Sequence, residues 1–198
     1  MTGRDSLSEW VPGLDDTETL EDAYSRMPGD GASAIPWYVR VLENPASPLA
    51  LPGAIDLFGH DCIHMVLGRG TLPPDEAVVL GMTMGTSGCL AAWQRRLYAF
   101  VAGTLYQGPW RLGPDDLLLF GMAVQFATHQ RIAPLAKVSW RDMKKRQLGD
   151  IRASLGIRIV ELLRFYEIER MMWPASIAAQ RLPKPSAGGV VRPVSPDE

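Results

Sequence analysis

Two histidines four residues apart are the strongest chemical feature of the sequence. His60 and His64 lie in the string HDCIHMVLGRGTLPPDE, with Asp61 between them and Glu76 at its end, after eleven intervening residues. Side chains at i and i+4 of a helix lie one above the other, so a helix here presents both imidazoles on one face. Asp61 is about 100° around that helix from His60, and a short loop lets Glu76 fold back over the pair. Two imidazoles and two carboxylates suit a divalent ion such as Zn²⁺, Fe²⁺, Mn²⁺ or Co²⁺.

The same residues also have a purely structural interpretation. A histidine pair at i, i+4 occurs on ordinary polar helix faces, and Glu76 in a first helical turn interacts favourably with the helix dipole. The joint spacing in an otherwise apolar stretch favours the metal site. An HD-type phosphohydrolase site needs a further histidine upstream, and none of the three histidines precedes His60.

Helix signals dominate the segments that must position these residues. No run alternates apolar and polar residues over six positions, and no Asn-Gly or Asp-Gly hairpin signal occurs, whereas proline, acidic and glycine residues mark helix starts and ends. The sequence therefore predicts an all-α fold, a single domain of six or seven helices. The expected helices cover residues 17–27, 36–43, 52–68, 73–106, 114–130 and 140–155, the last continuing or restarting after Gly156 and running to 172.

Charge and composition suggest how the chain is divided. Residues 1–30 hold eight acidic and two basic residues, whereas residues 131–170 hold ten basic and five acidic ones. These segments are either solvated helical faces that attract each other or, for the basic one, a surface toward anionic lipid or a carboxylate ligand. We expect an acidic segment at 1–30, a helical domain at 31–181 and a disordered tail rich in proline and glycine at 182–198.

Overall composition excludes several classes of protein. The 198 residues are 46% hydrophobic and carry a net charge of −2, which suits a soluble globular protein and gives no general attraction to nucleic acid. Two cysteines cannot form a disulfide framework. The N-terminal residues resemble neither a signal peptide nor a mitochondrial presequence, so we expect a cytoplasmic protein.

A charge-free stretch at residues 77–94 raises the question of a membrane span. Its hydroxyl groups and three glycines make it too polar for one, and a buried helix fits better. Within it, Gly81, Gly85, Gly88 and Ala92 fall at i, i+4, i+7 and i+11, a stripe of small side chains. Such a stripe serves either close helix packing or a groove for a thin apolar ligand, which makes the three glycines weak substrate-binding candidates.

The motif at 60–76 resembles the HDxxH-x11-E motif of the Coq-four family, the coenzyme Q biosynthesis proteins of mitochondria and their bacterial relatives. The likeness continues in the Leu67-Gly68 pair, in the string MTMGTSGC, and in a tryptophan-containing segment that closes on a Leu-Gly-Ile sequence at 155–157. It covers roughly residues 36–157. The resemblance implies that His60, Asp61, His64 and Glu76 are metal ligands, with Asp61 or Glu76 also a candidate for catalytic proton transfer.

The resemblance also implies a function. Family members are mostly helical dimers at the membrane surface that associate with other quinone-biosynthesis proteins. The implied activity is metal-dependent removal of the C1 carboxylate of a polyprenylated hydroxybenzoate, coupled to hydroxylation at C1, with zinc or iron as the metal. The corresponding expectation is a homodimer at the inner face of a bacterial membrane. An alternative is a non-catalytic scaffold that binds prenyl lipids, and another is a related enzyme that acts on a different aromatic acid.

Several other residues have a weaker case for function. Met65, Met82 and Met84 could line an isoprenoid channel or fill the core. Cys62 is expected to face the core, and His129 to be a favourable helix C-terminal residue. Four basic residues could steer an anionic head group or a membrane surface, or belong to a solvated helix face; they are Arg141, Lys144, Lys145 and Arg152.

Overall fold

The computed structural model describes residues 10–28, 47, 51–104 and 111–184. These residues form eight α-helices and two 3₁₀ turns and contain no strand, which confirms the all-α prediction with one helix more than the upper expectation. The elements in chain order are α2 (Leu20–Ser25), α4 (Leu57–Leu67), α5 (Pro73–Gly85), α6 (Ala92–Thr104), α7 (Pro114–His129), η3 (Leu135–Lys137), η4 (Trp140–Met143), α8 (Leu148–Leu155), α9 (Ile159–Met172) and α10 (Ile177–Arg181).

Helices α4 and α5 form a hairpin with well-defined ends. Asp56 caps α4 by accepting a hydrogen bond of 2.8 Å from the Gly59 N–H, so the helix begins later than residue 52. Gly68 ends it in the left-handed conformation, with φ of 66°. Two prolines then open α5, and the Asp75 carboxylate accepts a hydrogen bond from the Leu72 N–H.

The predicted single helix at 73–106 is wrong. The chain leaves the helical path after Gly85, passes Gly88 at φ of 70°, and starts again at Ala92. Glycine readily adopts a positive φ, which does not occur within a right-handed helix. Nothing in the run of small residues distinguishes Gly88 from a glycine inside a helix. Gly88 and Ala92 therefore do not continue a stripe from α5.

The remaining glycines of the stripe form a helix seam. A Cβ at Gly81 would lie 2.7 Å from the Cβ of Ala123, and a Cβ at Gly85 would lie 2.6 Å from the Val124 oxygen. Both neighbours belong to α7, and α5 and α7 form the most extensive helix pair of the described structure. The small residues thus permit close helix packing, and α7 occupies the space that a ligand groove there would need.

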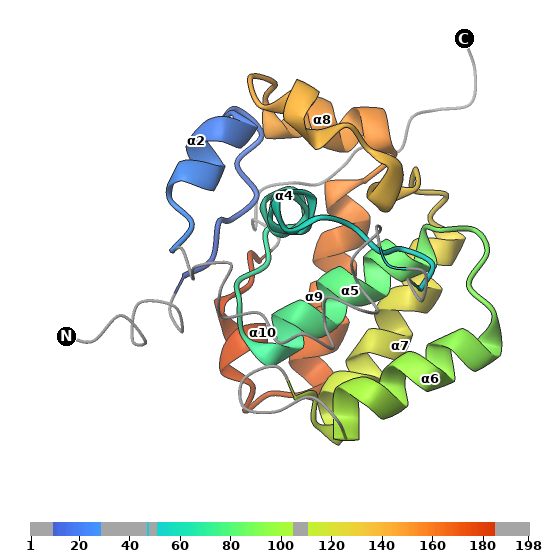
Figure 1. Cartoon of the computed structure of the whole chain (residues 1–198). Helices are drawn as coiled ribbons and strands as arrows, with labels where there is room; N and C mark the ends of the chain where they lie inside the picture. Colours follow the sequence, from blue (N-terminus) through green and yellow to red (C-terminus); the bar gives the residue numbers. More distant parts are fainter. Residues whose placement is uncertain (1–9, 29–46, 48–50, 105–110, 185–198) are drawn as a thin grey trace, which may run out of the picture.

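The helices are arranged around α4 and α5 (Figure 1). Helix α4, seen almost end on, has α2 and α8 on one side and α5 on the other, while α6 and α7 flank α5 farther away. One hydrophobic core joins α2, α4, α5, α7, α8 and α9, and a smaller one joins α5, α6 and α7 around Tyr98 and Phe120. Packed helices therefore lie on both sides of the α4–α5 hairpin.

The acidic N-terminal segment is not separate from the domain. Leu20 and Ala23 are fully buried in the main core. The Leu20 N–H donates to the Arg146 carbonyl at 3.0 Å, and the Leu148 N–H donates to the Glu18 carbonyl at 2.8 Å. The described part of this segment, residues 10–28, thus completes the side of α4 away from α5.

The C-terminal half also differs from the expectation. The segment at 140–147 is a 3₁₀ turn and loop before α8 and not the start of a helix. Gly156, at φ of 75°, ends α8 and the chain restarts in α9, which is one of the two expected alternatives. Helix α10 follows Pro174 and was not predicted, and Leu182, the first residue of the expected tail, is buried in the core. The expected helix at 36–43 and the tail from 185 onward lie outside the described residues.

None of the helices in the described ranges has the length and apolar character that a membrane crossing requires. The interpretation of residues 77–94 as a buried helix holds only for the first part: residues 77–86 of this stretch are buried apart from the partly buried Leu80, whereas residues 87–94 are partly or fully exposed.

Candidate metal centre

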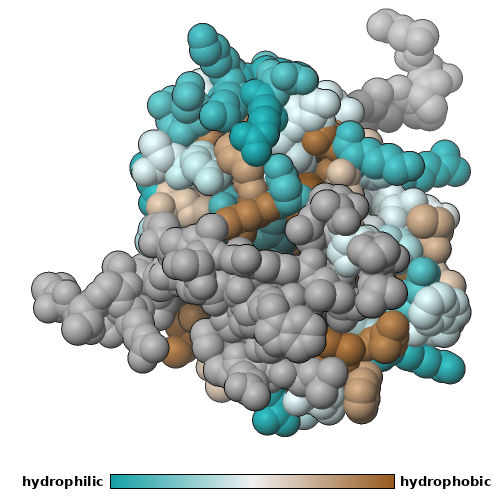
Figure 2. Space-filling view, viewed as in Figure 1, coloured by the Kyte–Doolittle hydropathy of each residue, from teal (hydrophilic) through white to brown (hydrophobic). Residues whose placement is uncertain are grey.

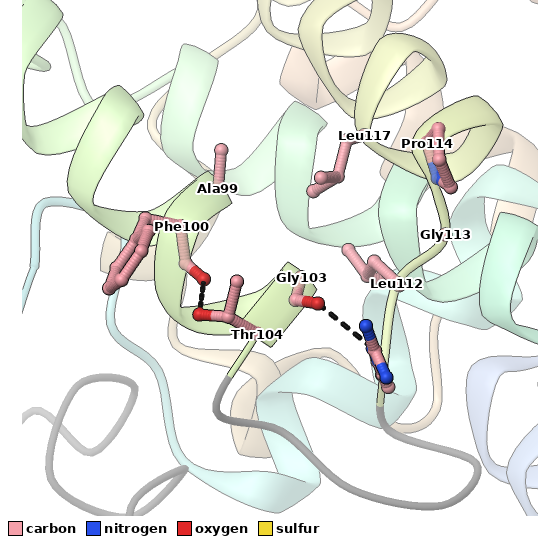
Figure 3. A pocket seen from close by; sticks show the side chains of 9 residues that line it. Ala99, Phe100, Gly103, Thr104, Leu112, Gly113, Pro114 and Leu117 are labelled. Carbon is pink, nitrogen blue, oxygen red and sulfur yellow. Dashed lines mark hydrogen bonds between the residues drawn. The ribbon is translucent and has the colours of Figure 1, made fainter.

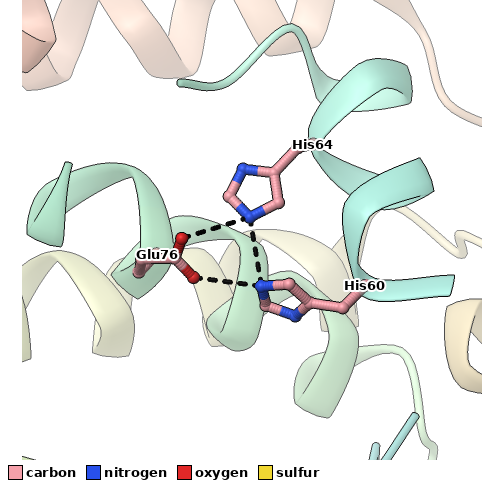
Figure 4. A group of neighbouring side chains, drawn as sticks. All are labelled: His60, His64 and Glu76. Carbon is pink, nitrogen blue, oxygen red and sulfur yellow. Dashed lines mark hydrogen bonds and ion pairs between the residues drawn. The ribbon is translucent and has the colours of Figure 1, made fainter. Parts of the chain in front are cut away.

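His60, His64 and Glu76 come together between α4 and α5 (Figure 4). Both imidazoles project from α4 toward the carboxylate on α5. The Nε2 atom of His60 lies 3.1 Å from that of His64 and 3.0 Å from Glu76 Oε2, and His64 Nε2 lies 3.4 Å from Glu76 Oε1. In the described part of the chain, this is the group of His, Cys, Asp and Glu side chains whose spacing suits a metal ion.

The hydrogen bond of His64 on its far side sets the chemistry of the group. His64 is fully buried, and its Nδ1 lies 2.7 Å from the Gly70 carbonyl oxygen, which can only accept. Nδ1 therefore carries a proton, and in the neutral ring Nε2 presents a lone pair to Glu76 and His60. An N–H donated to a carbonyl is the usual second contact of a metal-bound histidine.

The distances fit a single metal ion. Two ligand atoms that lie about 2.1 Å from one metal are about 3.0 Å apart at a right angle and about 3.4 Å apart at a tetrahedral angle. The three separations of 3.0, 3.1 and 3.4 Å fall in this range. A proton or a cation must lie among these lone-pair atoms, because otherwise they would repel one another. Two imidazoles and one carboxylate are also the donors that zinc and non-haem iron accept.

The charge of the site favours a cation. Burial by itself raises the pKa of Glu76, but without a metal the positive charge of a doubly protonated His64 and the hydrogen bonds from both histidines outweigh it, so this pKa lies well below its ordinary value. A metal ion would take the place of the proton between His64 and Glu76. Glu76 is thus a carboxylate in the folded protein. The side chains of His60 and Glu76 remain 17% and 18% exposed, so one side of the group is open to a further ligand.

Asp61 is not brought into the ligand group. Its Oδ2 accepts a hydrogen bond of 3.4 Å from the Tyr24 hydroxyl on α2. Burial raises the pKa of Asp61, while His60 and His64 oppose this increase. The helix turns Asp61 about 100° away from His60, which here is enough to direct it toward α2. Asp61 therefore lies beside the centre, in electrostatic contact with it, and the four-ligand prediction reduces to three.

The basic residues predicted from the sequence have separate roles. Arg152 is 1% exposed and donates to the Val66 carbonyl at 2.8 Å and to Asp16 at 2.7 Å. It binds the end of α4 and the acidic segment, so both earlier interpretations of it, a solvated face and a ligand-steering group, are wrong. Arg141 is exposed, pairs with Asp56 at 3.3 Å and lies over a phenylalanine ring, with Lys144 over the same ring. Lys145 is exposed.

The remaining candidates belong to the core or to helix ends. Met65, Met82 and Met84 are buried. Cys62 is buried as well, and burial raises the pKa of its thiol to about 12, so it is unreactive at neutral pH. His129 is the last residue of α7, and its Nδ1 bonds the Gln125 carbonyl at 2.7 Å.

One group next to the site was missed by sequence reasoning. Arg69, in the loop between the ligand helices, is fully buried and pairs with Asp75 and with Glu169 on α9. A charged residue between two glycines in an apolar stretch was the available signal. Its partner, a hundred residues away, could not be inferred from spacing.

Comparison with known proteins adds no family: no family model, curated protein or solved structure matches this chain.

Proposed function

We propose that this protein is a metal-dependent enzyme that removes the C1 carboxylate of a prenylated hydroxybenzoate and hydroxylates the same carbon. The observation that carries the proposal is the convergence of His60, His64 and Glu76, with a carbonyl-bound His64, within a sequence that resembles the Coq-four motif. Of the metals that these donors accept, Fe²⁺ suits a reaction with O₂ best, because two histidines and one carboxylate leave positions open.

The three metal-binding residues and Asp61 would have separate roles in the reaction. His60, His64 and Glu76 would hold the metal, which would supply a positive charge to the substrate carboxylate and a site for O₂ chemistry. Asp61, half-buried next to the centre with a raised pKa and a hydroxyl partner, is placed to hold or pass a proton. Each turnover would release CO₂, place one oxygen atom of O₂ on the ring and reduce the other to water with two electrons from an external donor.

An apolar cavity offers a place for the prenyl tail (Figure 3). It lies between the C-terminal part of α6 and the start of α7, with a volume of about 620 Å³. Phe100, Leu112 and Leu117 line it, and the two leucines pack in the same core as Ala77, which directly follows the ligand Glu76. This cavity replaces the glycine stripe as the proposed tail site.

The same helix supports association with a membrane surface. Trp93, Leu97 and Phe100 lie three and four residues apart on α6 and are 63%, 39% and 60% exposed. Arg95 and Arg96 lie between them, and α6 has no acidic residue. Figure 2 shows hydrophobic residues next to hydrophilic ones at the lower right of the molecule, where Figure 1 places α6. Exposed tryptophan and phenylalanine beside arginine are typical of helices that lie in an anionic lipid interface.

Turnover by the purified protein tests the catalytic proposal. The chain is loaded with Fe²⁺ and given a short-tail prenylated 4-hydroxybenzoate, O₂ and a reductant, and CO₂ and the hydroxylated ring are measured. His64→Ala should lose both products and most of the bound metal. If the metal-loaded parent binds the substrate but forms no product, the non-catalytic scaffold is the better function. If His64→Ala retains the metal, the metal centre itself is refuted.

Vesicle binding tests the lipid surface. The parent should sediment with vesicles that contain phosphatidylglycerol and less with vesicles of phosphatidylcholine alone. The double variant Trp93→Ser/Phe100→Ser should lose most of this binding, whereas Leu118→Ser, a change at an exposed leucine on α7, should retain it. Equal binding by both variants would refute the role of α6.

A further inference from the structure

We infer that Arg69 is a positioning residue for the metal centre: its buried guanidinium fixes the loop whose Gly70 carbonyl holds His64. The inference rests on the proposed metal site and is independent of the reaction that occurs there. It assigns a role to a group of charged residues that lies outside the ligand set and whose long-range partner the sequence did not reveal.

The loop that contains Arg69 connects the two helices that carry the proposed ligands. It joins the end of α4, which carries both histidines, to the start of α5, which carries Glu76. Its Gly70 carbonyl accepts the Nδ1–H of His64 at 2.7 Å and so sets which nitrogen faces the metal. A shift of this loop therefore changes the His64 tautomer, the ring orientation and the separation of the two ligand helices together.

Arg69 anchors this loop from within. Its Nη1 and Nη2 donate to the two carboxylate oxygens of Glu169 at 2.7 and 3.1 Å, and Nη2 also donates to the Pro74 carbonyl at 3.3 Å. Its Nε lies 3.1 Å from Asp75 Oδ1. The guanidinium lies over the ring of Tyr166, 5.2 Å from its centroid. One side chain thus connects the loop to α5 and to α9.

The other members of the network hold the two ends of the loop. The Tyr166 hydroxyl donates to the Leu67 carbonyl at the end of α4. The Asp75 carboxylate accepts from the Leu72 N–H at 3.1 Å and pairs with Arg181 of α10 at 3.1 Å. Two arginines and two carboxylates balance in charge, and the backbone groups of Leu67, Leu72 and Pro74 are bound by members of the network.

Stability alone is a weak explanation for such a network. A buried ion pair repays its desolvation poorly, and apolar residues of similar volume are often as stabilising. What an apolar pair cannot reproduce is the planar fork that aligns two oxygens of Glu169 and a backbone carbonyl at once. Geometry is the property that the metal centre requires, because outer contacts of a ligand histidine typically change metal affinity about 10- to 100-fold.

The test separates geometry from stability. In Arg69→Met/Glu169→Met both charges are removed together, so the chain should fold with a chelator-measured Tm close to that of the parent. We expect its Co²⁺ affinity to fall at least about tenfold and its Co²⁺ absorption spectrum to change. Arg69→Lys keeps the charge without the fork and should show the same two changes. The matched control is Arg164→Met/Glu161→Met, a surface pair on α9, which should alter neither.

The parent protein supplies a measurement that does not depend on any variant folding. The Nδ1–H proton of His64 should give a distinct imidazole NMR signal protected from exchange with water, because His64 is fully buried. A rapidly exchanging proton in the parent, or unchanged Co²⁺ affinity in folded Arg69→Lys or in the double variant, would overturn the inference. Failure of His64→Ala to lose metal would instead refute the metal site on which it rests.

Discussion

Replacing Gly81 by alanine tests whether the small residues of α5 form a helix seam or border a ligand groove. An alanine Cβ would lie 2.7 Å from both the Ala123 Cβ and the Phe120 carbonyl oxygen, closer than such atoms approach one another. Overpacking of this kind costs about 1–3 kcal/mol. Alanine recovers about 0.8–1.0 kcal/mol over glycine in a helix interior. Gly81→Ala should therefore lower the free energy of unfolding by up to about 2 kcal/mol.

Gly121 provides the matched control on the partner helix. It also lies inside a helix, α7, but a Cβ there meets no atom within 4 Å. Gly121→Ala should raise the free energy of unfolding by about 0.8–1.0 kcal/mol, because only the propensity gain remains. Urea unfolding of both variants in chelator measures the difference, expected at about 1–3 kcal/mol. Equal stabilisation of the two variants would refute the seam and return the space beside Gly81 to a possible ligand.

Four further outcomes follow from the structure. Glu76→Gln should weaken metal binding at least about tenfold, whereas a pure dipole role would cost only about 0.3–1 kcal/mol with the metal retained; metal titration and unfolding of one preparation distinguish them. In chelator, the stability advantage of the parent over Glu76→Gln should be present above the ordinary pKa of 4.5 and shrink as the pH falls through the lowered pKa, and a pH-independent difference would contradict this. Asp61→Asn should keep the metal and lose turnover, and loss of the metal would restore Asp61 to the ligands. Arg152→Met should cost about 1–3 kcal/mol of stability in thermal or urea unfolding, because the Val66 carbonyl loses its buried donor; an unchanged midpoint would show that water or another donor replaces it.

The features that the sequence predicted correctly depend on interactions between residues close together in the chain. The turn at Gly68, the prolines of α5 and the i, i+4 histidines act over a few residues, and the hairpin that joins His60, His64 and Glu76 followed from them. The break at Gly88 was missed because its backbone conformation leaves no mark in a run of small residues.

The long-range features could not be predicted in the same way. Asp61 had the right spacing for a ligand, but the position of α2 gave it the Tyr24 hydroxyl instead. Arg152 was grouped with a solvated helix face and Arg69 was not singled out, and only the packing of distant segments shows that both are buried. The spacing of residues along one helix determines the relative directions of their side chains. The burial of a side chain depends on which other segments of the chain pack against it.

The separation of the ligands from their support has a consequence for biosynthesis. All three ligands lie within one short hairpin, but Arg69 finds Glu169 only after another hundred residues of chain. At about 5–20 residues per second, a ribosome needs about 5–20 seconds for that distance. The nascent hairpin thus has its donors long before the helix that fixes their loop, so a metal captured early would be held loosely and exchange with its surroundings. If the centre binds a metal as proposed, the ion would be selected finally when the C-terminal helices dock, so the metal supply at chain completion would decide which ion the mature protein holds.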